Sequence, residues 1–176
     1  PVEAGAGRSI DDHLPDVTGA IWSAPNPRLF DWLRRVAPDV RSVGVLYNPS
    51  DANAFREKEE VRVLLESHGL RLVERTVANP SDVPQAAQSL LAAGVEAVFG
   101  MSDATVATAF AGLVQECRKG RVPLLADDAS TMGSGALFSC GASPILEGRR
   151  TGRLILRVLA GESPASIPFA PSEDAE

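Results

Sequence analysis

The sequence predicts an α/β protein in which a doubly wound, mainly parallel sheet carries helices on both faces. Short apolar runs alternate with longer amphipathic stretches along the chain, and short polar loops separate them. That alternation is typical of βα units, whose strands are parallel and whose crossovers are right-handed. The run 43–47 is apolar at almost every position, as expected for a strand that helices cover on both faces.

The first part of the chain contains few regular elements. Residues 1–16 are rich in glycine and then acidic, without a periodic pattern, so we expect a connector. Residues 17–22 form a short strand candidate. Asn26 and Pro27 favour a helix start, because asparagine caps helices well and proline fits the first helical position. One apolar face follows, and Pro38 ends this helix.

The strand over 43–47 leads into a polar turn and a long helix. Asn48–Asp51 has turn composition, and Asp51 or Asn53 then caps a helix predicted to begin near residue 52 and to end near residue 67. Alanine, valine and leucine give this helix one apolar face. Its charged residues within 56–62 predict a solvated face with weak i,i+4 ion pairs.

The alternation continues to the end of the chain, where proline, glycine and short polar residues separate the elements. In order we expect strand 70–77, helix 79–93, strand 95–99, helix 103–119, strands 122–126 and 136–140, and helix 144–160. Residues 161–176 are rich in proline and acidic residues, and we expect a loose tail.

Composition excludes some classes of partner. The chain has 176 residues, 44% apolar content and a formal net charge of -6. An acidic balance without a lysine and arginine stripe argues against nucleic acid and anionic membranes. Cys117 and Cys140 are far apart in the sequence, which favours two small buried side chains over a disulfide or a metal site and leaves their oxidation state open. No signal peptide or membrane-spanning run is visible.

The sequence contains no recognisable catalytic set. His13 and His68 are predicted to be surface residues outside any metal-ligand spacing. Neither a glycine-rich phosphate loop nor a nucleophile elbow is present, and 133–135 is predicted to be a turn. The pair Asp127 and Asp128 could hold Mg²⁺, although a solvated or ligand-facing turn is the favoured interpretation. We therefore predict no cofactor and no enzyme.

Three loops are expected to meet at the carboxyl edge of the sheet, where open α/β proteins bind ligands. Helix N-termini there suit a carboxylate, and Asp103 and Asp127 suit an ammonium group, so together they suit a zwitterion such as an amino acid. The alternative is that Ser50, Ser102 and Asp103 are only helix caps. The candidate ligand-binding residues are Asn48, Ser50, Asn53, Ala54, Ser102, Asp103 and Asp127.

Several short motifs occur in a fixed order along the chain. Residues 1–5 resemble "DPV-x-aG", 16–19 "NvTG", 43–54 "igvlyNpsE-x-NS", 102–106 "x-D-x-tv", 135–141 "GaLaslG", and 148–152 with 155–164 "G-x-x-a" and "iL-x-Gekp-x-iP". This ordered set, which covers nearly the whole chain, resembles the ABC-transporter substrate-binding proteins of the type I periplasmic-binding fold, in the branch with tryptophan- and tyrosine-binding members.

The resemblance implies one lobe of a two-lobed solute receptor outside the cytoplasmic membrane, which delivers a small ligand to an ABC permease. Residues 1–19 would be a connector from a first lobe that this chain lacks, 20–140 the Rossmann-like ligand-binding lobe, and 141–176 a return helix and tail. Ala54 stands where the family has serine, and Asp51 stands near the usual glutamate. The apolar face of helix 144–160 would lack its sheet, which suggests a homodimer through this helix.

Two other functions remain open from the sequence. One is a small-molecule sensor or regulatory domain with the same lobe, fused to a signalling module. The other, more distant, is an α/β enzyme, although no nucleophile and base stand together in the sequence.

Overall fold

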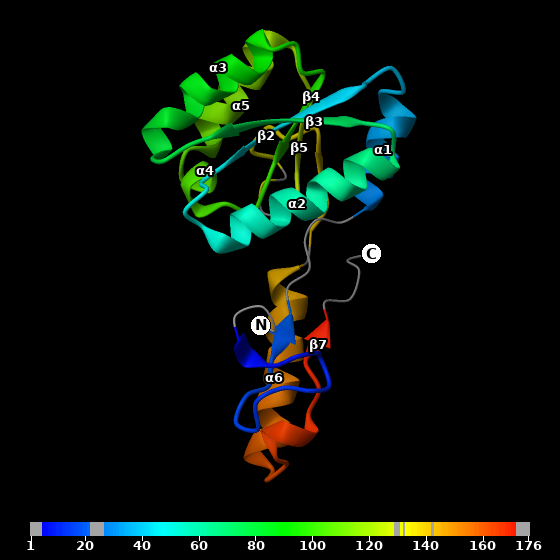
Figure 1. The fold of residues 1–176 in the computed structure, drawn as a ribbon, viewed down its shortest axis with the longest axis vertical. Helices are drawn as coiled ribbons and strands as arrows, with labels where there is room; N and C mark the ends of the chain where they lie inside the picture. The colour runs from blue at the N-terminus through cyan, green and yellow to red at the C-terminus, as the bar shows by residue number, and fades with distance from the viewer. Residues whose placement is uncertain (1–4, 22–26, 129–130, 132, 142, 172–176) are drawn as a thin grey trace. The chain divides into compact units, whose positions relative to one another are not determined.

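The computed structural model describes residues 5–21, 27–128, 131, 133–141 and 143–171. The chain folds into two compact units (Figure 1). The larger unit spans residues 24–141, and the smaller combines 1–23 with 142–176. The predicted strand over 17–22 and the predicted cap Asn26 extend into residues outside the described part of the chain.

A five-stranded parallel sheet forms the centre of the larger unit. Its strands lie in the order β3-β2-β4-β5-β6, and every neighbouring pair is parallel. The strands are β2 (Ser42–Tyr47), β3 (Arg71–Thr76), β4 (Ala97–Gly100), β5 (Leu124–Ala126) and β6 (Phe138–Ser139). This topology confirms the predicted doubly wound α/β class, and every one of these strands except β2 is shorter than its predicted range.

Helices cover both faces of this sheet (Figure 1). One core contains the apolar sides of α1 and α2 against β2 and β4, including Phe30 and Phe99, whose ring centroids are 5.5 Å apart. The other core contains α3, α4 and α5, with Cys117 buried among them. The helices are α1 (Arg28–Val36), α2 (Ala52–Ser67), α3 (Val83–Ala92), α4 (Ala104–Thr108) and α5 (Phe110–Gly120), and a 3₁₀ turn, η2 (Pro80–Asp82), precedes α3.

Local signals fix the ends of α2. Its bounds agree with the predicted helix, because Asp51 caps its first turn and Gly69, at φ 65°, follows its last residues. Within β2, Gly44 permits close packing of α3. A Cβ at this position would lie 3.0 Å from Leu90 Cδ1 and 3.3 Å from Val95 Cγ1.

The prediction of one continuous helix over 103–119 was wrong. The chain breaks at Ala109, whose φ and ψ of -111° and 19° are not helical, so α4 and α5 are separate. The Thr108 hydroxyl donates a hydrogen bond to the carbonyl oxygen of Ala104 at 2.8 Å. Such back-bonding bends helices, and here it coincides with the break. The break places Phe110 at the start of α5.

The smaller unit contains α6 (Pro144–Leu159), a 3₁₀ turn, η4 (Pro164–Ser166), and a two-stranded parallel sheet. The sheet pairs β1 (Ala20–Ile21) with β7 (Ala170–Pro171). The prediction of a loose tail was therefore wrong for residues 161–171. Ile167 and Phe169 are buried, and the Thr18 hydroxyl donates to the Ile167 carbonyl oxygen at 2.8 Å. Residues 172–176 lie outside the described part of the chain.

One side of α6 exposes large aliphatic side chains. Leu154 is buried, but Ile145, Ile155 and Leu159 are 68%, 53% and 77% exposed. Leu146 and Leu156 are also more than half exposed. An ordered helix thus presents an apolar face, as the sequence predicted, and the residues described here leave that face open to solvent.

Candidate ligand-binding site

The strand order creates a crevice at the carboxyl ends of β2 and β4. The chain leaves β2 toward β3 on one side, whereas β4 and β5 continue on the other. Open α/β sheets bind ligands where the strand order reverses in this way. Asn48 follows β2, Ser102 and Asp103 follow β4, and Asp127 follows β5.

Asp103 ties two of these loops together. It is 1% exposed, and its Oδ2 accepts a hydrogen bond from the backbone N–H of Asn48 at 2.7 Å. Its Oδ1 caps α4 by accepting from the backbone N–H of Val106 at 2.8 Å. The Asn48 side-chain amide donates to the Thr105 hydroxyl at 3.1 Å. Both carboxylate oxygens of Asp103 therefore serve the fold, which favours the structural interpretation of this residue.

A second cluster joins α2 to the loops after β4 and β5. The Ser102 hydroxyl donates to Asp127 Oδ2 at 2.8 Å. The Ser102 backbone N–H lies 3.3 Å from Glu57 Oε1 and 3.2 Å from Glu57 Oε2. Glu57 and Asp127 are 6% and 2% exposed. Two carboxyl groups from distant parts of the sequence thus share one buried position at the crevice.

Burial controls the ionisation of this pair. Burial and the adjacent Asp127 carboxyl raise the pKa of Glu57 to about 9. Burial also raises the pKa of Asp127, whereas hydrogen bonds from Glu57 and Ser102 favour its charged form. Two carboxylates in contact in a dry site repel each other, so one of them keeps a proton at neutral pH. The pKa of Glu57 is the one that lies above neutral pH, so Glu57 keeps the proton.

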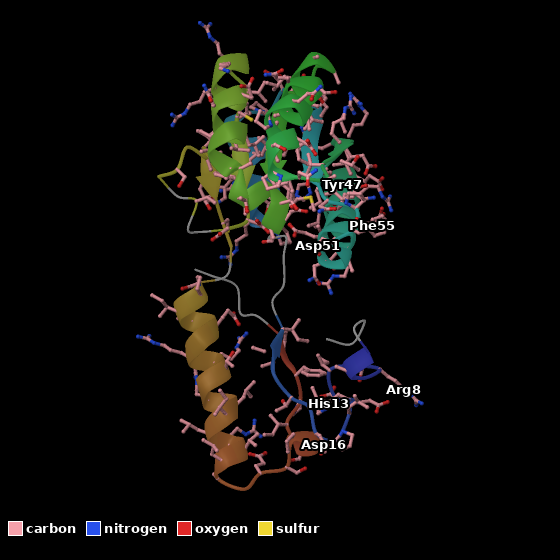
Figure 2. All side chains as sticks on the ribbon, turned by 90° about the vertical axis from the view of Figure 1, so that its left-hand side faces the viewer. Arg8, His13, Asp16, Tyr47, Asp51 and Phe55 are labelled. Carbon is pink, nitrogen blue, oxygen red and sulfur yellow. The ribbon has the colours of Figure 1, made fainter. Side chains whose placement is uncertain are left out.

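The predicted solvated face of the charge run was wrong for Glu57 and Lys58. Both are buried, Lys58 at 5% exposure. The Lys58 ammonium lies 4.6 Å from the Phe55 ring centroid and 5.4 Å from that of Tyr47, and it pairs with Glu59 and Glu74. Figure 2 shows Tyr47, Asp51 and Phe55 grouped where β2 leads into α2.

The position of Glu57 on the predicted helix indicates that its side chain is buried. It stands three residues after Ala54 and four before Val61, both fully buried. Positions with this spacing share a face of a helix, so α2 turns Glu57 toward the sheet. The solvated face was predicted from the charge of this residue alone, without its position on the helix.

The other predicted ligand-binding residues, Ser50, Asn53 and Ala54, lie around the start of α2. Asp51 Oδ1 accepts from the backbone N–H groups of Asn53 and Ala54 at 2.8 and 3.3 Å, so the cap occupies donors that were assigned to a ligand. The Ala54 side chain is fully buried in the core and does not reach the crevice. Ser50 and Asn53 are exposed, and the Ser50 N–H donates to Asn48 Oδ1 at 2.9 Å.

A cavity of about 250 Å³ opens beside Asp127. Its apolar wall comes from β4, α4, α5 and β5, and its polar wall from the loops after β4 and β5. The apolar side chains are Met101, Ala107, Phe110 and Ala126, and the polar ones are Ser102, Asp127, Asp128, Thr131 and Ser134. Of this lining, Ser102 and Asp127 belong to the predicted binding set, and Asp128 was predicted in a solvated or ligand-facing turn. A mixed wall of this kind suits a small molecule with both an apolar and a charged part.

The remaining titratable side chains form no further centre in the part of the chain that the structure describes. No group of three or more His, Cys, Asp and Glu residues there could hold a metal ion. Burial raises the pKa of the Cys117 thiol to about 11, as expected for an inert core residue. His13 and His68, which were predicted at the surface, are both half-buried. The His13 ring lies tilted against Phe169 with ring centroids 4.7 Å apart, and His68 bonds to Asp31.

A family model of ABC transporter substrate binding proteins matches residues 13–176. The chain belongs to this family. The match confirms the resemblance that the motifs predicted. A curated relative, the tyrosine-binding protein of Clostridioides difficile (strain R20291), is 24% identical over 176 residues, which cover 100% of this chain and 51% of the relative. This substrate-binding chain thus spans about half the length of the curated relatives it matches.

Solved structures show the same fold. The conserved domain protein from Vibrio cholerae O1 biovar eltor is 26% identical, with a TM-score of 0.88 over 100% of this chain and 59% of its own. The ABC domain from Streptococcus pneumonia, solved in complex with L-Trp, is 23% identical, with a TM-score of 0.90 over the same shares. None of the described helices of this substrate-binding chain has the length and apolar character needed to cross a membrane.

Proposed function

We propose that residues 20–140 bind an amino acid, as one ligand-binding lobe of an ABC import receptor. The observation that carries this proposal is the cavity beside Asp127, where an apolar wall meets a buried carboxylate. The family assignment and the relatives named for tyrosine and L-Trp support it. An aromatic or aliphatic side chain fits against Met101 and Phe110, and an ammonium group fits Asp127.

The other end of the ligand meets the loop after β2. The Asn48 amide has a second N–H besides the one it donates to Thr105, and Ser50 is exposed, so in this proposal the amide and the hydroxyl bind the carboxylate. Asn53 stands on the same exposed turn, and Asp103 holds this loop against the loop after β4. In this proposal Ser102 and Asp127 bind the ligand, whereas Asp103 and Ala54 support the fold.

The proposal includes a transport setting. An ABC permease would accept the solute, and the receptor would work outside the cytoplasmic membrane, in the periplasm or its equivalent. The runner-up is a sensor or regulatory domain that uses the same lobe. Relatives that are substrate-binding proteins argue against an enzyme. A neighbouring permease and ATPase gene pair would favour transport over sensing.

We further propose that a second copy of the chain covers the apolar face of α6. Five aliphatic side chains on this helix are more than half exposed, and such a stripe is unusual on a protein that remains alone in solution. A two-fold axis beside α6 would bring the same stripe of both copies together. Sedimentation of the chain over a range of concentrations tests this homodimer.

Unfolding measured with matched ligands tests the binding proposal. L-Tryptophan, tryptamine and indole-3-propionate share the indole ring, but tryptamine lacks the carboxylate and indole-3-propionate lacks the ammonium group. L-Tryptophan or L-tyrosine at 100 times its Kd should stabilise the chain by about 2.7 kcal/mol, and both truncated analogues should stabilise it less. Equal stabilisation by indole-3-propionate would contradict the role given to Asp127, and no stabilisation by any amino acid would contradict the proposed function.

A further inference from the structure

Glu57 lies at the centre of a closed set of contacts between three separate segments. It comes from α2, Ser102 follows β4 and Asp127 follows β5. Glu57 accepts from the Ser102 backbone N–H and the Ser102 hydroxyl donates to Asp127, so Ser102 brings the two buried carboxyl groups beside each other. Each member therefore fixes the position of the other two.

This arrangement requires one proton between the two carboxyl groups. Both are buried, and the charged groups that act on them are also acidic, namely Glu60 on α2 and Asp128 after β5. Asp103 after β4 already accepts two backbone hydrogen bonds. Lys58, the next residue of α2, pairs instead with Glu59 and Glu74. None of the described charged groups that act on the pair in this way is a cation, so the proton keeps the contacts closed.

We propose that Glu57 is a positioning residue, whose proton holds Asp127 and Ser102 in the geometry that binds the ligand. Glu57 itself does not line the cavity, whereas Ser102 and Asp127 do. This inference rests on the proposed function, because it assigns Glu57 a role in the same site. Loss of the proton would leave two negatively charged carboxylates side by side. Their repulsion would release the loops after β4 and β5 from α2.

Glutamine is the decisive substitution, because its amide reproduces a protonated carboxyl. In E57Q the amide NH₂ can donate to Asp127 while the amide oxygen accepts from Ser102. E57A removes the contacts, and E60Q is the matched control, since Glu60 stands on the same helix, undergoes the same Glu-to-Gln change and is half-buried.

L-Tryptophan affinity should be measured against pH for the four proteins. Near pH 7, E57Q and E60Q should bind as the unmodified chain does, and E57A should bind at least tenfold more weakly. Above about pH 9 the unmodified chain should lose affinity relative to E57Q by up to tenfold per pH unit. The ligand's own amino group titrates in the same way in both measurements, so its effect cancels in the ratio of the two affinities, that of the unmodified chain to that of E57Q. A ratio that stays constant with pH, or normal binding by E57A, would overturn the inference.

A ligand-free measurement separates this inference from the proposed function. In a nuclear magnetic resonance titration, the backbone amide signal of Ser102 should move with the Glu57 carboxyl carbon near pH 9, and this movement should be absent in E57Q. If the two signals move together but no amino acid binds, the proposed function fails and Glu57 still positions Ser102. If Ser102 does not respond to Glu57, the positioning role is refuted whether or not L-tryptophan binds.

Discussion

Asp103 and Asn48 join the ends of two neighbouring strands through one partly buried hydrogen bond. Asp103 Oδ2 accepts from the backbone N–H of Asn48 at 2.7 Å, while its other oxygen caps α4. This single carboxylate therefore fixes the loop after β2, the loop after β4 and the start of a helix. The two loops that border the crevice of the candidate site are therefore held to each other.

Asp103→Ala should destabilise the larger unit more than the loss of a simple cap. Removal of a cap costs about 1 kcal/mol, and the partly buried N–H of Asn48 would lose a charged acceptor worth about another 1.5–3 kcal/mol. We expect a total of about 3 kcal/mol from urea unfolding. Asp51→Ala is the matched control, because Asp51 only caps α2, and it should cost about 1 kcal/mol. Equal effects of the two substitutions would show that the tie to Asn48 contributes nothing.

The raised pKa of Glu57 predicts how the free energy of unfolding depends on pH. Its pKa is about 9 in the fold and 4.5 in its ordinary state, so the folded chain binds more protons than the unfolded chain between these values. The free energy of unfolding should therefore fall as pH rises from about 4.5 to 9, with a slope of at most about 1.4 kcal/mol per pH unit from this group.

Glu57→Gln should remove that slope, and it should make the chain more stable than the unmodified protein at pH 8. Urea unfolding at several pH values measures both effects. Glu60→Gln should leave the slope in place, because Glu60 is only half-buried. If the slope of E57Q equals that of the unmodified chain, Glu57 does not carry the proton.

The sequence predicted α2 well because its signals are local. Asp51 and Gly69 mark its ends, and both act within a few residues of the helix. The role of Glu57 depends on Asp127, which lies 70 residues away (127 − 57) and meets it only in the fold. The charge of Glu57 suggested solvent, whereas its helical position beside Ala54 pointed inward.

The errors at the other end of the chain have a similar cause. Composition suggested a loose tail, but Ile167 and Phe169 are two residues apart and both are buried, as in a short extended segment. The break at Ala109 coincides with a side-chain hydrogen bond of Thr108, and neither proline nor glycine marks it in the sequence. The convergence of Asn48, Asp103 and Asp127 was predictable, because parallel strands end at one edge.

Gly44→Ala should destabilise the larger unit although alanine favours strands more than glycine does. The new methyl group would lie 3.0 Å from Leu90 Cδ1, and overpacking of a core costs about 1–3 kcal/mol. The double substitution Gly44→Ala with Leu90→Val should recover part of the loss by making room. Unfolding in urea measures both variants. No loss in the single variant would mean that α3 moves away from β2 at little cost.

Leu159→Asp should weaken the proposed homodimer. This residue is 77% exposed on α6, so a charge there should not disturb the fold, but it would be buried in a dimer that uses this face. Sedimentation should show a dimer for the unmodified chain and a monomer for the variant. Val63→Asp is the matched control, since Val63 is 57% exposed on α2. A monomer at every concentration of the unmodified chain would rule out the dimer.

Backbone amide shifts during a titration with L-tryptophan or L-tyrosine test the central claim most directly. The account predicts saturable shifts centred on Asn48, Ser102 and Asp127, with a much larger Kd for Asp127→Asn, which removes the charge that meets the ammonium group. Saturable shifts confined to residues 143–171, or an unchanged Kd in Asp127→Asn, would contradict the assignment of the binding site to the carboxyl edge of the sheet.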